Sequence, residues 1–104
     1  MQYWKKHMAE VTVTKLMENQ IYMFSVVVKD ETSQTQHQVT LNKADYQRLT
    51  NGDVKPEHLI KKAFEYLLDQ EPKEKILPKF DFTRIGLYFP NFHNDIKKRM
   101  EDRK

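Results

Sequence analysis

The sequence predicts an α+β domain in which a three-stranded antiparallel β-meander is followed by three to four helices packed on one face. Two observations indicate this class. Alternating β-branched and apolar segments fill residues 11–41, and helical periodicity with proline and glycine stops fills residues 43–100. Strands that precede helices as a block favour α+β over alternating α/β folds. The 104 residues fit one domain, so we assign residues 1–8 to an N-terminal tail and 9–104 to a single domain.

Three segments have the pattern of strands. Residues 11–16 (VTVTKL) alternate and are rich in β-branched side chains. A short polar turn leads to residues 21–29 (IYMFSVVVK), which are apolar at nearly every position. Residues 37–41 alternate again after the polar loop 30–36. We therefore expect three consecutive antiparallel strands.

The second of these strands is apolar on both of its faces. Such a strand either lies in the centre with both faces covered, or has one face on the core and the other on a partner. Helices on one side of a three-stranded sheet leave the other face open, and an exposed apolar patch marks an interface. We therefore predict a protein interface, most simply between two copies of the chain. One row of the strand supplies the predicted contacts, Tyr22, Phe24, Val26 and Val28, and the other row carries Ile21, Met23 and Val27.

Capping residues place the first helices of the second half. Asn42 is a good N-cap for a helix at 43–50, and Asn51-Gly52 is a common left-handed stop. A longer helix is expected at 56–70, where the proline at its first position costs nothing because the missing N–H would have no partner. The longer helix carries an apolar stripe of six residues at helical spacing: Leu59, Ile60, Ala63, Phe64, Leu67 and Leu68.

Prolines divide the rest of the chain. Pro72 ends the long helix, and one further turn fits before Pro78. Asp81 is the expected cap of a short helix at 82–89. A last helix begins near Phe92.

The residue types that common catalytic and cofactor chemistry needs are sparse. The chain has no cysteine, and its two glycines exclude a P-loop and a dinucleotide fingerprint. Gly52 is explained as a helix stop, and Gly86 by close packing of another element, such as the sheet or the long helix. The four histidines show neither helical i, i+4 spacing nor an HExxH run. We therefore expect no enzyme activity, no metal and no cofactor.

The charge pattern leaves one alternative function open. A formal net charge of +3 is too small to indicate a dedicated nucleic-acid binder, but basic residues gather at both ends of the chain. Lysines and arginines at a helix C-terminus also offset the macrodipole, which explains the C-terminal group without a partner. The alternative is weak nucleic-acid binding through six candidate contact residues: Lys5, Lys6, Lys97, Lys98, Arg99 and Arg103.

Hydropathy and cysteine usage bear on location. No apolar run approaches the roughly 20 residues of a membrane-spanning helix. The charged N-terminal residues are not followed by the apolar segment of a secretory signal. The absence of cysteine suits a reducing compartment. We therefore expect a cytoplasmic protein without a membrane partner.

The run from Phe64 to Phe92 (FEYLLDQEPKEKILPKFDFTRIGLYFPNF) is the densest pattern in the chain. Its elements FxYLL, EPKE, IL, FD and YFP, in this order, resemble the shared motif of a family of small, uncharacterised bacterial proteins with no assigned activity. The resemblance covers residues 56–92. It implies a stable shared fold, and it carries over no catalytic or binding residue.

These observations together predict a small non-enzymatic protein that acts by binding another protein or itself. The aromatic residues of the 64–92 run fall at helix spacing between prolines, which is typical of core packing. We therefore expect the working surface elsewhere, on the apolar second strand or on the two basic ends.

Overall fold

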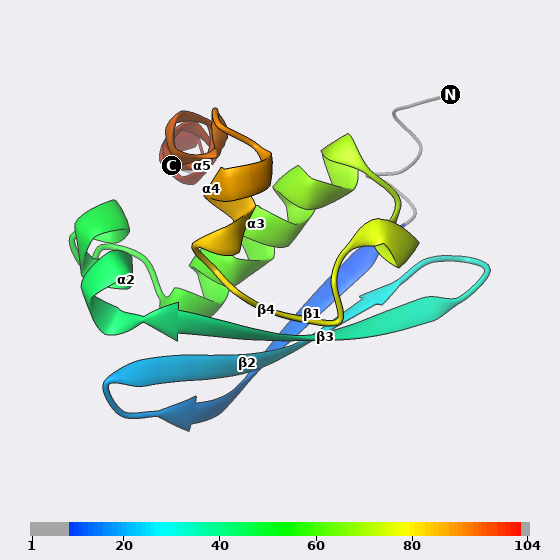
Figure 1. The fold of residues 1–104 in the computed structure, drawn as a ribbon, viewed down its shortest axis with the longest axis horizontal. Helices are drawn as coiled ribbons and strands as arrows, with labels where there is room; N and C mark the ends of the chain where they lie inside the picture. The colour runs from blue at the N-terminus through cyan, green and yellow to red at the C-terminus, as the bar shows by residue number, and fades with distance from the viewer. Residues whose placement is uncertain (1–8, 103–104) are drawn as a thin grey trace.

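The computed structural model describes residues 9–102 and has helices on one face of a four-stranded sheet (Figure 1). Strands β1 (Glu10–Glu18), β2 (Ile21–Lys29) and β3 (Gln34–Asn42) form an antiparallel meander. Strand β4 (Lys79–Asp81) pairs with β3 in parallel and completes the order β1-β2-β3-β4. The predicted α+β class and meander are confirmed, whereas the prediction of a purely antiparallel three-stranded sheet is wrong.

Strand β4 was not predicted from the sequence because it is only three residues long and follows a proline. Its pairing is extended at both ends by backbone hydrogen bonds. The Gln38 N–H donates to the Pro78 carbonyl at 2.8 Å, and the Phe82 N–H donates to the Thr40 carbonyl at 2.8 Å. Periodicity cannot reveal so short a strand, since its partner lies about 40 positions away in the chain.

In the described part of the chain, four α-helices and one 3₁₀ turn complete the fold. They are α2 (Lys43–Thr50), α3 (Pro56–Gln70), the turn η1 (Lys73–Lys75), α4 (Arg84–Tyr88) and α5 (Phe92–Asp102). Helix α3 crosses the sheet, and α4 and α5 lie on the side of α3 that faces away from it (Figure 1). The long helix therefore forms a middle layer.

The predicted helix signals are confirmed where they are local. The Asn42 side chain accepts a hydrogen bond from the Ala44 N–H at 2.8 Å, as an N-cap does. Asn51 and Gly52 have φ angles of 55° and 77°, which is the left-handed stop expected after α2. All six residues of the predicted apolar stripe of α3 are buried.

The prediction for β2 chose the wrong face. Tyr22, Phe24, Val26 and Val28 are 7%, 0%, 0% and 0% exposed, because they face α3 and belong to the core. The register explains this: Phe24 pairs with Val39, and paired residues of antiparallel strands point to the same side. The solvent-facing residues of β2 come instead from the row with Ile21, Met23 and Val27.

Asp81 and Gly86 have different neighbours from those predicted. Asp81 ends β4, and α4 begins three residues later; its carboxylate accepts hydrogen bonds from the Thr83 N–H at 3.1 Å and the Thr40 hydroxyl at 2.6 Å. It therefore closes the turn before the helix and is not the N-cap. A side chain at Gly86 would meet His93 of α5 at 3.6 Å, an ordinary contact, so neither the sheet nor α3 packs closely there.

A buried lysine ties η1 to the loop between β2 and β3. The Lys73 side chain is only 4% exposed, and its ammonium lies 2.7 Å from a carboxylate oxygen of Asp30 and 2.7 Å from one of Glu74. Asp30 also accepts hydrogen bonds from the N–H groups of Thr32 and Ser33 in its own loop. The ammonium and these donors hold the pKa of Asp30 well below its usual range, and the two carboxylates raise the pKa of Lys73.

We predict that Lys73→Met lowers the free energy of unfolding by about 1–2 kcal/mol, because Asp30 loses a charged partner in a partly buried position. Lys62→Met removes a pair with Glu65 in which both side chains are partly exposed, so it should change the free energy of unfolding by less than about 0.5 kcal/mol. Urea unfolding at neutral pH measures both.

The ion pair between Lys73 and Asp30 should also make the stability of the fold decrease at acidic pH. Because the pKa of Asp30 is depressed in the fold, its stabilising effect is present above its unfolded pKa of about 3.9 and is lost as the pH falls below that value. Equal stabilities of wild type and Lys73→Met at pH 7 would contradict the proposed role of the pair.

Candidate functional site

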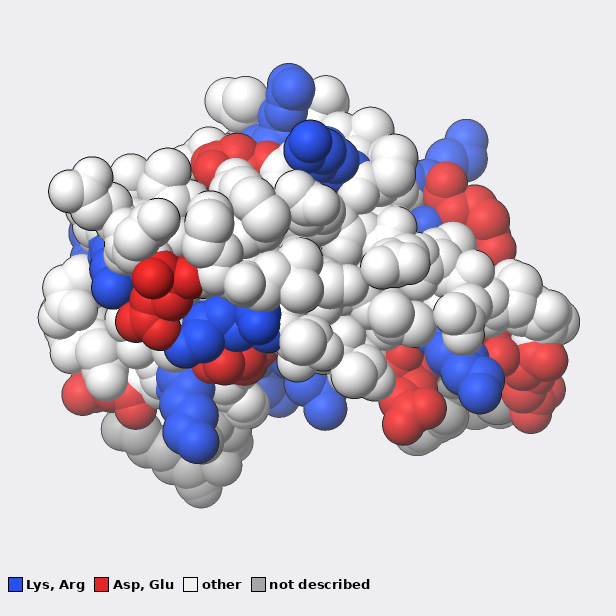
Figure 2. All heavy atoms as spheres, turned by 90° about the horizontal axis from the view of Figure 1, so that it is seen from below, with Lys and Arg blue, Asp and Glu red and all other residues white. Residues whose placement is uncertain are grey.

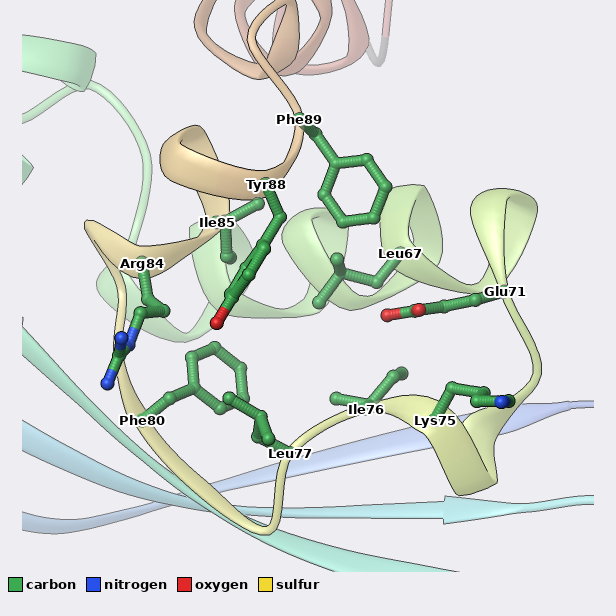
Figure 3. A pocket seen from close by; sticks show the side chains of 10 residues that line it. All are labelled: Leu67, Glu71, Lys75, Ile76, Leu77, Phe80, Arg84, Ile85, Tyr88 and Phe89. Atoms are coloured by element: carbon green, nitrogen blue, oxygen red, sulfur yellow. The ribbon is translucent and has the colours of Figure 1, made fainter.

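An apolar groove opens between the C-terminal end of α3, the η1–β4 segment and α4 (Figure 3). Its volume is about 270 Å³. Pockets that bind drug-sized ligands start at roughly this size, so the groove can hold one or two side chains or a small molecule. Ten residues line it: Leu67, Glu71, Lys75, Ile76, Leu77, Phe80, Arg84, Ile85, Tyr88 and Phe89.

The groove exists because α4 is too short to cover the space beside α3. Leu67 of α3 and Ile85 of α4 are buried beneath the groove, at 3% exposed each. Helix α4 ends after only five residues. As a result, Leu77 and Tyr88 at the rim are 42% and 61% exposed. Apolar side chains of this size on an opening, rather than scattered singly, indicate a binding surface.

Three charged residues belong to the groove, and they point in different directions. The carboxylate of Glu71 points into the space between Leu67 and Ile76, whereas the Lys75 and Arg84 side chains are directed away from it (Figure 3). Burial raises the pKa of Glu71, and the charge of Lys75 partly opposes this effect. The interior of the groove therefore contains one carboxylate, and both cations lie at its margin.

A buried histidine holds the wall of the groove. The ring of His37 on β3 is 3% exposed, and its Nδ1 lies 2.8 Å from the carbonyl oxygen of Leu77. Since a carbonyl can only accept, Nδ1 carries the hydrogen and donates it. The Nε2 atom then accepts from the Thr35 hydroxyl at 2.8 Å. Burial lowers the pKa of His37, so the neutral ring that this geometry requires is favoured.

The open face of the sheet is a second candidate surface. Figure 2 views the molecule from this side and shows a broad area without charged residues, with Lys, Arg, Asp and Glu mainly at its margins. The strand registers place uncharged residues of three strands side by side on this face: Thr12, Thr14, Met23, Ser25, Val27, Gln36, Gln38 and Thr40. Ile21, at one end of this face, is 40% exposed.

The basic residues proposed for nucleic-acid contact do not share one environment. Lys97 and Lys98 are exposed on α5. Arg99 instead forms an ion pair with Asp69, and its guanidinium carbon lies 5.4 Å from the centre of the Tyr66 ring. The three remaining candidates lie outside the part of the chain that the structure describes: Lys5, Lys6 and Arg103.

Two further findings concern metals and membranes. Within residues 9–102, no three histidine, aspartate or glutamate side chains come close enough together to hold a metal ion. Over the same residues, no helix combines the length and the apolar character needed to cross a bilayer.

The groove lies in the run of residues 64–92 that was predicted to be core alone. The segment Ile85-Gly86-Leu87-Tyr88-Phe89 could have indicated that part of this run is exposed. In a helix so short, four large apolar residues in five positions cannot all face the core. Tyr88 and Leu87 are indeed exposed, whereas Ile85 is buried.

Comparisons with protein-family models, with curated proteins and with solved structures found no match. The resemblance of residues 56–92 to a bacterial family therefore stays a prediction. The groove and the open sheet face are the features from which a function can be inferred.

We predict that protonation of His37 destabilises the protein. Because its pKa is depressed in the fold, its contribution is present above the unfolded pKa of about 6.5 and decreases as the pH falls below that value. His37→Asn keeps an N–H donor near the Nδ1 position and cannot titrate. Urea unfolding between pH 7.5 and 5 should show a loss of stability in the wild type that exceeds the loss in the variant. Parallel pH profiles of the two proteins would refute the prediction.

Proposed function

We propose that this chain is a small non-enzymatic protein that binds another protein, and that its groove receives a side chain of the partner. The observation that carries the proposal is the exposed apolar rim, formed by Leu77 and Tyr88, above a cavity of about 270 Å³. Interfaces derive most of their binding energy from a few anchors that fill such depressions.

Two features favour a protein partner and binding alone. The groove is open along one side, so a ligand bound in it remains partly exposed to solvent. In a protein complex, the surrounding rim of the interface would cover such a side chain. Its lining contains one carboxylate and neither histidine nor serine, so it lacks the nucleophile and base pair of common hydrolytic sites. We therefore favour binding over catalysis, and we place the protein in the cytoplasm as part of the same proposal.

The proposal predicts a selective loss of binding. Leu77→Gln and Tyr88→Gln should each weaken retention of a specific partner from an extract of the native host by about fivefold or more, since a hot-spot contact contributes over about 1 kcal/mol. Leu87→Gln is the matched control, because Leu87 is apolar and 75% exposed but does not line the groove. Quantitative mass spectrometry of the retained proteins measures the effect.

The comparison with the control variant also defines the result that would contradict the proposal. Retention of the same proteins by wild type, Tyr88→Gln and Leu87→Gln would exclude the groove as the binding surface. Circular dichroism should show that all variants are folded, since none of the replaced side chains is buried in the core.

A second candidate is self-association through the open face of the sheet. In a twofold-symmetric dimer, identical patches meet, so a charged patch would oppose its own charges. The centre of this face has none (Figure 2). Met23 and Val27 supply apolar area on this face, and Ile21 extends it at one end. This observation supports the homodimer, on the face opposite to the one that the sequence suggested.

Self-association has a direct test. If the dimer forms, sedimentation should show it at micromolar concentration, and Met23→Glu should convert it to monomer by placing like charges opposite each other. Leu87→Glu carries the same charge change on another surface and should leave the dimer intact. A wild-type protein that sediments as a monomer would eliminate this candidate.

Nucleic-acid binding remains the weaker proposal. Of the candidate residues in the described part of the chain, Lys97 and Lys98 project freely from α5, whereas Arg99 is engaged by Asp69. Two exposed lysines supply little of the phosphate neutralisation on which such binding depends.

A further inference from the structure

We infer that the side chain received by the groove is a lysine of the partner protein. The inference rests on the proposed function of the groove and adds the chemistry of its ligand. Three features of the groove favour an apolar stem that ends in a positive charge: the inward carboxylate of Glu71, the C-terminus of α3, and the aromatic wall.

Glu71 supplies a negative charge inside an otherwise apolar space. Its carboxylate points between Leu67 and Ile76 (Figure 3), and among the described residues it has no ion pair within 4.0 Å. A carboxylate that is partly removed from water without a partner is costly, and a cation bound beside it would offset that cost. The raised pKa of Glu71 agrees with a carboxylate that lacks such a partner.

The end of α3 adds to the negative potential at this point. Glu71 is the C-cap of α3, and the last turn of this fifteen-residue helix contains no basic residue. The partial negative charge of a helix C-terminus attracts cations and disfavours anions. A glutamate at this position is thus unfavourable for the isolated fold, and its charge adds to the attraction of the helix end for a positively charged ligand.

The aromatic wall suits the same ligand. Phe80 of β4 and Tyr88 of α4 extend toward each other from opposite sides of the groove, and the Phe89 ring lies on the side of Leu67 (Figure 3). Ring faces attract an ammonium group, and the methylene stem of a lysine packs well against rings and aliphatic side chains. A lysine side chain therefore matches both the lining and the charge.

The directions of the two cations at the margin of the groove bear on whether the ligand could instead be acidic. Lys75 and Arg84 would favour an acidic ligand if they pointed into the groove, but both are directed away from it (Figure 3). They are placed to contact the periphery of a partner.

The experiment compares three blocked pentapeptides, acetyl-Ala-Ala-X-Ala-Ala-amide, in which X is lysine, norleucine or glutamate. Norleucine keeps the apolar stem and lacks the ammonium group. Amide chemical shifts of groove residues in the ¹⁵N-labelled protein report binding. The lysine peptide should bind about three- to tenfold more tightly than the norleucine peptide.

Two variants locate the origin of the difference. Glu71→Gln should lower the affinity for the lysine peptide to that for the norleucine peptide and so abolish the preference. Glu65→Gln removes the same charge from the outer side of α3, where Glu65 pairs with Lys62, and should leave the preference intact. Because Glu71→Gln removes a carboxylate from a helix C-terminus, it should be at least as stable as wild type.

The outcomes separate the two proposals. Equal binding of the lysine and norleucine peptides, or tighter binding of the glutamate peptide, would overturn the inference and leave the groove as a binding site. Groove signals that respond to none of the three peptides would overturn the proposed function together with it.

Discussion

The position of α3 between the sheet and the C-terminal helices is the constraint on which the rest of the structure depends. The ring centre of Phe64 lies 5.4 Å from that of His37 on β3 and 6.0 Å from that of Phe80 on β4. On another side of the helix, the ring centre of Tyr66 lies 5.2 Å from that of Phe92 on α5. The chain has no cysteine, so packing of this kind must hold the layers together without disulfides. The helix must therefore bury apolar side chains in two directions, and the groove is the space that its C-terminal end leaves uncovered.

The parts of this arrangement that depend on neighbouring residues could be predicted from the sequence. The apolar stripe that packs α3 on the sheet recurs at helical spacing, and Asn42 and Gly52 mark helix ends through contacts within a few positions. The meander could be predicted for the same reason, because its strands are consecutive and are joined by short polar turns. In each case the physical cause and the sequence signal lie in the same short segment.

The parts that depend on distant segments could not be read in this way. Strand β4 pairs with β3 through three residues, and the Phe80 ring, which lies against Phe64, is the tertiary contact that places it. Both rows of β2 are apolar, so β2 alone could not show which row is buried. The sequence of β3 does indicate its buried row, since Val39 and Leu41 alternate with Gln38 and Thr40. The buried row of β2 follows from this only when the register between the two strands is known.

The position of Glu71 supports the proposal that the groove is a binding surface and not a gap left by packing. Exposed apolar side chains such as Leu87 are common on protein surfaces and need no functional explanation. A carboxylate is different, because its placement in an apolar groove at the negative end of α3 costs stability twice, once through desolvation and once through the helix dipole. Among the described residues, Glu71 forms no ion pair within 4.0 Å, and the charge of Lys75 only partly opposes the effect of burial on its pKa. If the bound ligand supplies the missing positive charge, the unfavourable position of this carboxylate is explained by binding, as the further inference proposes.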